Sequence, residues 1–340
     1  MTVTDFTQYR TFIDGLARSE TGRLLRKELL HRWPETTDEL DAITRYALLP
    51  TGKLIRPLMA LYAAEAVGGN PADILVAVLG LEYLHAATLV HDDIIDGDAV
   101  RRGKASVPAA FGMANAIIAG DHLIFGAFES IVDEPWVASP ARVIAAVGAL
   151  AEAGRDLCRG QALESRLVGD LDAGRRWYPE MIRLKTGALF RTACYVGATL
   201  GGAATEEIAN RLAAYGEHLG IAFQIRDDLL SFVATPERTG KPEMSDLVNG
   251  RPTLPLLLAY AAAAEAERSE LRAVLGRRGA GSGDMDWVRG LVVDTGAVAA
   301  ARRRMAEHVE RAVAELAALT PSASVRVLTG IARWTTSEAQ

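Results

Sequence analysis

The chain has 340 residues, 49% apolar and 24% charged, a composition typical of a globular protein with a sizeable core. Its net charge of −6 argues against a nucleic-acid partner, whose phosphates would require a surplus of Lys and Arg. The two well-separated cysteines, Cys158 and Cys194, match no disulfide framework and no zinc motif. There is no signal-like N-terminus and no uninterrupted apolar run long enough to span a bilayer, so a cytoplasmic location is expected.

Apolar residues recur at three- and four-residue spacing along almost the whole chain, which predicts helices. Strand-like alternation and Asn-Gly or Asp-Gly hairpin signals are not found. Gly, Pro and polar clusters predict helix ends at Pro34, 49–52, 68–71, 103–108, 134–140, 170–174, 201–205, 235–242, 276–283 and 320–321. Because no linker separates the segments, residues 1–340 are predicted to form one all-α domain, a bundle of about ten or more helices.

An acidic cluster ends the apolar helical segment that begins near residue 74. It comprises Asp92, Asp93 and Asp96, and the first and last of these lie one turn apart on a helix. Carboxylates this close repel one another, and acids near a helix C-terminus oppose its dipole. Hard oxygen ligands of this kind suit Mg²⁺, which usually bridges to substrate phosphates. The cluster therefore predicts a metal site rather than a solvated helix end.

A second acidic pair, Asp227 and Asp228, lies inside another apolar helical segment. Two such motifs in apolar helices predict opposite walls of one cavity. A diphosphate could be held between these walls through shared metal ions.

Basic residues accompany both acidic motifs. They occur as Lys53 with Arg56, Arg101 with Arg102, Lys185 with Thr186, and Lys241 with Arg251 around Asp246. Each alone would be an ordinary solvated charge. Together, beside predicted metal sites, they indicate two diphosphate pockets, since Arg gives forked hydrogen bonds to phosphate and Lys a point charge.

Five segments, GKLIRP, LHAATLVHDDIIDGDAVRRG, KTGALF, GIAFQIRDDLL and GKPEMSDLVNGRPTLP, resemble in order and spacing the signatures of the trans-isoprenyl diphosphate synthases. The resemblance implies an all-α isoprenoid-synthase-like bundle around a central cavity, and a homodimer. It also implies Mg²⁺-dependent head-to-tail condensation of isopentenyl diphosphate with an allylic prenyl diphosphate, giving a linear trans-prenyl diphosphate.

The resemblance also implies roles for single residues. Asp92, Asp93 and Asp96 correspond to a motif that binds two Mg²⁺, and Asp227 and Asp228 to one that holds a third. The allylic diphosphate is expected at Arg101, Lys185, Thr186, Gln224 and Lys241, and isopentenyl diphosphate at Lys53, Arg56, His85 and Arg102. Arg251 corresponds to a lysine that caps the closed site, and Gln161 to a polar position near the metals. The expected catalytic set is Asp92, Asp93, Asp96, Arg101, Lys185, Asp227 and Lys241.

Two positions depart from the family pattern. Ser231 replaces the third Asp of the second motif, and Leu54 replaces an Arg of GKLIRP. Ser231 is expected to weaken the metal site without abolishing it. The positive charge missing at Leu54 is expected to be tolerated, because Lys53 and Arg56 still match the residues that bind diphosphate.

Product length is expected to depend on Thr88 and Ala87, four and five residues upstream of the first Asp motif. In the family, aromatic residues there stop growth at farnesyl length, so the small residues favour geranylgeranyl diphosphate or a longer product. Alternatively, Met113, Phe125 or Phe128 could form the floor of the channel that holds the growing prenyl tail and so limit product length.

Two alternatives remain. A class I terpene cyclase shares the fold and the first motif, and Asp227 with Ser231 fits part of its second motif, but Thr235 stands where it needs Glu. Such a cyclase also has no use for Lys53, Arg56, His85 and Arg102. A non-catalytic subunit of a heteromeric synthase should have lost more of its carboxylates.

Overall fold

A computed structural model describes residues 11–133, 138–233, 245–276 and 281–337, and these are almost entirely helical. The all-α prediction is confirmed, and most predicted breaks in the described ranges separate helices. The elements, in order, are α2 (Phe12–Arg18), α3 (Glu20–Arg32), α4 (Glu39–Leu48), α5 (Ile55–Ala66), η1 (Pro71–Ile74), α6 (Leu75–Asp96), β1 (Val100–Arg101), β2 (Lys104–Ala105), α7 (Val107–Phe111), α8 (Met113–Val132), α9 (Pro140–Leu167), α10 (Leu171–Ile182), η2 (Arg183–Gly187), α11 (Ala188–Leu200), α12 (Glu206–Val233), α14 (Ser245–Val248), α15 (Leu254–Ala262), α16 (Glu265–Val274), α17 (Ser282–Asp294), α18 (Ala297–Glu315), η3 (Leu316–Ala318) and α19 (Ala323–Ser337).

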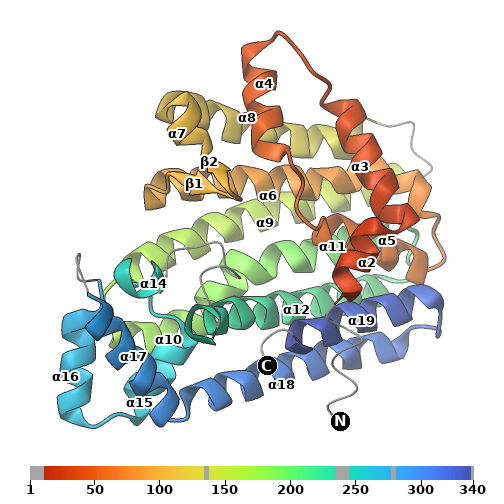
Figure 1. Ribbon diagram of the computed structural model, residues 1–340. Coiled ribbons are helices and arrows are strands. Elements are labelled where there is room, and N and C mark those ends of the chain that lie inside the picture. The colour runs from red at the N-terminus through yellow and green to blue at the C-terminus, as the bar shows by residue number, and fades with distance from the viewer. Residues whose placement is uncertain (1–10, 134–137, 234–244, 277–280, 338–340) are drawn as a thin grey trace.

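The long helices lie roughly side by side (Figure 1). α6 packs against α8, α11 against both α9 and α12, and α12 against α18, while α5 closes one side against α11 and α19. The helices α14 to α17 gather at the end of the bundle opposite α2, α5 and α19 (Figure 1). The two acidic motifs are consequently carried by α6 and α12, on different layers of the same bundle.

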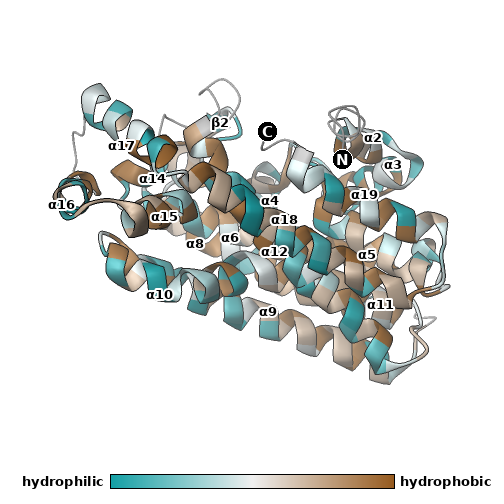
Figure 2. Ribbon diagram, turned by 90° about the horizontal axis from the view of Figure 1, so that it is seen from below, coloured by the Kyte–Doolittle hydropathy of each residue, from teal (hydrophilic) through white to brown (hydrophobic). Residues whose placement is uncertain are grey.

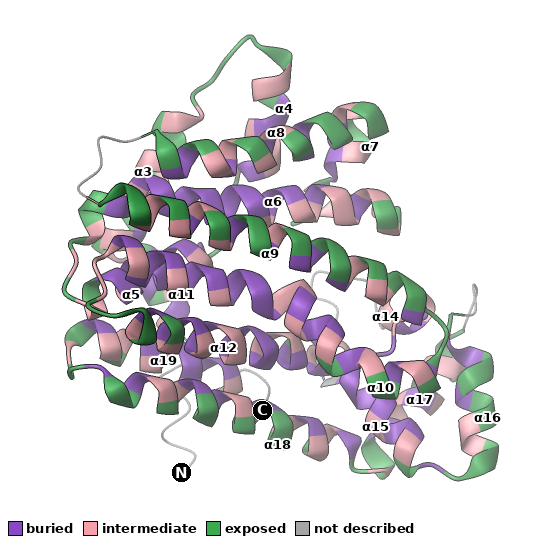
Figure 3. Cartoon of the chain, turned by 180° about the vertical axis from the view of Figure 1, so that it is seen from behind, coloured by how far each residue is buried: buried purple, intermediate pink, exposed green. Residues whose placement is uncertain are grey.

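α6 and α8 are long and apolar enough to cross a membrane by length and composition alone. In α6 the apolar stretch is 67% buried by its neighbours, so core packing accounts for it. In α8 the corresponding stretch is only 39% buried. Figure 2 shows the apolar character of the central helices, and Figure 3 shows that α6 and α11 are mostly buried while α8 and α9 expose an outer face.

A small β-hairpin follows α6, where the sequence predicted only a break. Val100 pairs with Ala105 and Arg101 with Lys104, leaving Arg102 and Gly103 as a two-residue turn. Both turn residues have positive φ, 52° and 77°, as such hairpin turns require. The expectation of no hairpin is therefore wrong here, because the turn uses Arg-Gly and not the commoner Asn-Gly or Asp-Gly.

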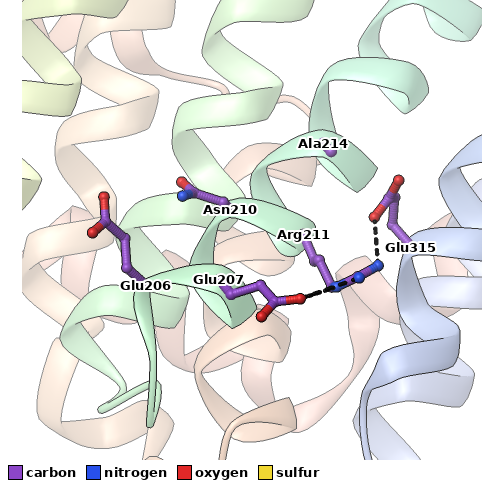
Figure 4. A pocket seen from close by; sticks show the side chains of 6 residues that line it. All are labelled: Glu206, Glu207, Asn210, Arg211, Ala214 and Glu315. Carbon is purple, nitrogen blue, oxygen red and sulfur yellow. Dashed lines mark hydrogen bonds and ion pairs between the residues drawn. The ribbon is translucent and has the colours of Figure 1, made fainter.

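A polar seam joins α12 to α18. Arg211 of α12 lies 3.2 Å from Glu207 and 3.5 Å from Glu315 of the facing helix end, beside a surface depression (Figure 4). Further along the seam, His218 and His308 are in contact through their Nδ1 atoms at 3.3 Å, with ring centroids 5.3 Å apart. One imidazole must donate and the other accept, so the contact requires at least one neutral ring.

The histidine pair predicts a loss of stability in mild acid. Burial lowers the pKa of both rings; His218 and Arg311 lower that of His308 further, to about 4, while Glu217 and Glu315 partly oppose the shift at His218. Below pH 6.5 the unfolded chain therefore binds protons that the folded pair does not, and stability falls as pH drops from about 6.5 toward 4. We expect His308→Gln to reduce the fall in melting temperature between pH 7 and pH 5, and the same change at the exposed His31 to have no such effect. An equal fall in melting temperature between pH 7 and pH 5 in the His308→Gln and His31→Gln variants would contradict the prediction.

Candidate active site

The first acidic cluster lies at the C-terminal end of α6. The helix ends at Asp96, and Gly97 follows with φ +69°, the left-handed conformation common after a helix. Asp92 and Asp96 share one face, whereas the intervening Asp93 is rotated about 100° away. Because carboxylates oppose the helix dipole here, each needs a nearby cation.

Asp93 is bound by the hairpin. Arg101 donates from Nε to Oδ1 of Asp93 at 2.8 Å and from a second nitrogen to the same oxygen, and it also lies 3.4 Å from Asp98. The Asp93 side chain is 2% exposed. Burial raises the pKa of Asp93, and the hydrogen bonds from Arg101 lower it. The structure therefore joins Asp93 and Arg101 as one unit, apart from the face that carries Asp92 and Asp96.

Asp92 and Asp96 face a mixed cluster of charges from four other segments. Arg251, from the loop before α15, donates to Asp96 and lies 3.7 Å from Asp246 of α14. Lys185, in the π-helical turn η2, donates to Glu164 of α9. Burial raises the pKa of Asp92, and the charges that act on it come from Lys185, Glu164, Asp96 and Arg251.

The donor set in this cluster fits a hard divalent cation. The carboxylates of Asp92, Asp96, Glu164 and Asp246 outnumber the two cations that lie among them. Within the described ranges, no three acidic, His or Cys side chains are gathered closely enough to hold a metal by themselves. Mg²⁺ commonly takes only one or two carboxylates and completes its shell with water and substrate phosphates. The arrangement therefore suits a metal that arrives with a diphosphate.

The second acidic motif is divided between the interior and the surface of the site. Asp228 is buried and accepts hydrogen bonds from the Tyr178 hydroxyl at 2.6 Å, Leu254 N at 2.9 Å and Gln224 Nε2 at 3.0 Å. Burial raises the pKa of Asp228 to about 7, although these three donors lower it. Gln224 in turn accepts from the Thr186 hydroxyl at 2.7 Å, so Asp228 orients a polar chain between α12 and η2.

Asp227 is the more accessible carboxylate of the pair. Its side chain is 48% exposed and lies 3.4 Å from Arg226. Ser231, one turn further, donates to Asp246 at 3.1 Å. The departure at Ser231 thus leaves a hydrogen bond where the family pattern has a carboxylate, and Asp246 supplies a carboxylate next to it.

A basic cluster lies beside α6: it joins Arg56 of α5, His85 of α6, and Arg101 and Arg102 of the hairpin. Burial lowers the pKa of Arg56 to about 10, while Glu82 and Asp227 raise it. His85 has its pKa well below the usual value, because of burial and then of Arg56, Arg102 and Arg101. Three guanidinium groups therefore act on His85, and the buried Glu82 is a counter-charge to Arg56 and Arg102. Such a surplus of positive charge in a desolvated place suits an anion.

A row of aromatic rings runs from Arg56 of this cluster to Trp334 of α19. Arg56 lies 4.5 Å from the ring centroid of Phe190, and Phe190, Phe223 and Trp334 follow one another at 5.5 and 6.1 Å. Lys53 lies 5.3 Å from the Trp334 ring and 3.3 Å from Asp14. Lys53 and Arg56 therefore lie at the two ends of the row. Arg102 packs against Gly52, where an added Cβ would lie 3.0 Å from the Arg102 guanidinium.

Ala87 is fully buried on α6, and Thr88 is half-buried with its hydroxyl bonded to the His85 carbonyl. Met113 and Phe125 are 61% and 71% exposed, so they are not placed to close a channel inside the chain. Phe128, the third residue of this alternative, packs against the core, and the alternative stays a prediction. Close contact of α6 with α8 occurs at Gly80, where a Cβ would stand 2.4 Å from Ser130 Oγ.

Sequence reasoning missed three side chains that the fold brings to these sites: Glu82, Glu164 and Tyr178. Glu82 stands in apolar helical surroundings, which is a usable signal, because such acids are rarely buried without a partner. Glu164 lies among polar residues such as Gln161 and Arg166, so its sequence context gives no such signal. Tyr178 carries no comparable signal, whereas the sequence places Asp246 beside Lys241 and Arg251 but indicates no role of its own for it. Lys241 lies outside the described residues.

Comparison with known proteins agrees with this geometry. The polyprenyl synthetase family model matches residues 37–292. The geranylfarnesyl diphosphate synthase of Aeropyrum pernix is 38% identical over 82% of this chain and 86% of its own. The solved geranylgeranyl pyrophosphate synthetase of Pyrococcus horikoshii superposes with a TM-score of 0.89 at 30% identity, covering 97% of this chain and 99% of that one. A Caulobacter crescentus polyprenyl synthase, solved with calcium and isoprenyl diphosphate, superposes with a TM-score of 0.84 at 30% identity. The match covers 96% of this chain and 97% of that one.

The fold and the site define an all-α enzyme of the prenyltransferase class. The chain belongs to the polyprenyl synthetase family.

Proposed function

We propose that the chain acts as one domain and condenses isopentenyl diphosphate with an allylic prenyl diphosphate, head to tail, releasing a linear trans-prenyl diphosphate. The observation that carries this function is the presence of two separate cation groups around α6. Lys185 and Arg251 lie among the carboxylates, and Arg56, Arg101 and Arg102 surround His85. Two cation groups suit the binding of two diphosphate substrates, whereas a terpene cyclase binds only one diphosphate substrate.

The carboxylates of Asp92, Asp96 and Asp227 are proposed to hold Mg²⁺, which would neutralise charge on the departing diphosphate. The Caulobacter crescentus polyprenyl synthase was solved in complex with calcium and isoprenyl diphosphate, which supports a role for a divalent cation. Asp93 and Asp228 are proposed to act mainly by orienting Arg101 and Gln224, because protein donors already occupy them.

The chain's own residues perform the rest of the reaction. Lys185, Thr186 and Arg251 bind the allylic diphosphate and stabilise it as the carbon–oxygen bond breaks. Arg56, Arg102 and His85 hold isopentenyl diphosphate so that its double bond attacks the allylic cation, and a proton is then lost to the departing diphosphate. The row of Phe190, Phe223 and Trp334 excludes water that would quench the cation.

The chain is proposed to form a homodimer in the cytoplasm. α8 exposes Met113, Ile117, Ile118, Phe125 and Val132, all at least 45% accessible, and contiguous apolar side chains of this kind usually mark an interface. Light scattering in solution tests the oligomeric state.

A product of geranylgeranyl length or longer is proposed, with the tail running along α6 past Thr88 and Ala87. The Pyrococcus horikoshii and Aeropyrum pernix proteins, named for such products, support this length. Gly80, about 18 Å of helix from Asp92, is one place where α6 and α8 are in close contact.

Ala87→Phe or Thr88→Phe is therefore expected to shift the product toward farnesyl diphosphate, because an aromatic ring would block the tail. Thr88→Val, which keeps the side-chain size, should leave the product unchanged. Overpacking costs about 1–3 kcal/mol, so thermal melting must accompany the product analysis. An unchanged product from a folded, active double Phe variant would show that these residues do not line the tail.

Incubation with isopentenyl diphosphate and an allylic primer tests the proposed reaction, since a synthase must consume both.

A further inference from the structure

Glu164 of α9 is the carboxylate shared by the two cations of the allylic diphosphate site. Lys185 donates to its Oε2, and Arg251 Nε lies 4.0 Å from the same oxygen. The Glu164 side chain is only 12% exposed. Both cations are groups that the proposed function assigns to diphosphate, so the inference below rests on that function.

The surrounding backbone fixes this contact. η2 is a π-helical turn that presents Lys185, and π-turns are frequent at functional sites. Gly160 lets α9 approach closely, since a Cβ there would stand 2.5 Å from Lys185 N. Glu164 follows four residues later, on the same face of α9, and so reaches the Lys185 ammonium.

Arg251 is held from three sides. It donates to Asp96 and lies near Asp246, and Glu164 lies opposite. Without an anion between them, an ammonium and a guanidinium this close would repel each other and turn toward solvent. A carboxylate between them keeps both pointed into the site before substrate arrives.

We propose that Glu164 is a positioning residue that occupies the place of the diphosphate in the ligand-free enzyme, holding Lys185 and Arg251 in place and yielding them when diphosphate binds. Glu164 therefore competes with the diphosphate for the same cations. Removing its charge should strengthen binding of a metal-free diphosphate, because the competitor is lost, while leaving the cations less well oriented for catalysis.

Calorimetric titration of inorganic pyrophosphate, with EDTA present, measures this competition without turnover. Glu164→Gln is expected to lower the dissociation constant of pyrophosphate about 3- to 10-fold. Glu164→Asp, which keeps the charge, should stay nearer the wild type. Glu152→Gln is the matched control, since Glu152 lies on the same helix but pairs with Arg191 at 3.1 Å.

In steady-state kinetics, Glu164→Gln is expected to lower both KM for the allylic substrate and kcat, a split that general loss of structure would not produce. Unchanged or weaker pyrophosphate binding in a folded Glu164→Gln variant would overturn the proposal and favour a role as a metal ligand. Failure of the wild type to bind pyrophosphate when Mg²⁺ replaces EDTA would overturn the proposed function as well, so the two failures are distinguishable.

Discussion

Asp92→Asn is expected to reduce turnover by roughly a thousandfold, equivalent to about 4 kcal/mol of lost transition-state stabilisation. Asp92 and Asp96 form the carboxylate face at the end of α6, and Asn keeps the shape of Asp92 while removing its charge. The melting temperature should not fall, because burial raises the pKa of Asp92 and its ionised form is thus costly in the folded state.

The matched control is Asp121→Asn on α8, where an exposed carboxylate lies 3.7 Å from His91, at the surface. This variant should turn over normally. Near-normal turnover in Asp92→Asn would remove the basis for placing a metal at this face.

Arg56→Gln is expected to lower kcat/KM for isopentenyl diphosphate by about 100-fold, with KM for the allylic substrate changed far less. Arg56 has a buried Nε without a hydrogen-bond partner, and charge-assisted bonds to phosphate are among the strong ones. A loss of about 100-fold corresponds to roughly 2.7 kcal/mol.

Loss of Arg56 also leaves the buried Glu82 without its main counter-charge, which should lower the melting temperature. The double variant Arg56→Gln/Glu82→Gln should recover stability but not affinity for isopentenyl diphosphate. Recovery of both would mean that Arg56 only stabilises the fold.

The helical architecture could be predicted from the sequence because its signals are local. Pro34, Gly68 and Pro321 end helical periodicity by their own backbone chemistry, and helices do end near them. The hairpin at Arg102 and Gly103 and the π-turn at Lys185 could not be predicted in this way. Neither has a strong local sequence signal, and both depend on packing against α4, α6 and α9.

The candidate site was predictable in its residue types and only partly in its pairings. Helical geometry alone separates Asp93 from Asp92 and Asp96, but its pairing with Arg101 depends on the unforeseen hairpin. Glu164 and Asp246 reach the cluster from segments distant in the chain, so their contribution became visible only in the folded structure.

The most direct test of the central claim is product analysis after incubating the wild-type enzyme with Mg²⁺, isopentenyl diphosphate and each of several allylic primers. We expect that both substrates are consumed, that pyrophosphate is released, and that a linear prenyl diphosphate of geranylgeranyl length or longer accumulates. Formation of a cyclic hydrocarbon from the primer alone, with isopentenyl diphosphate untouched, would contradict it.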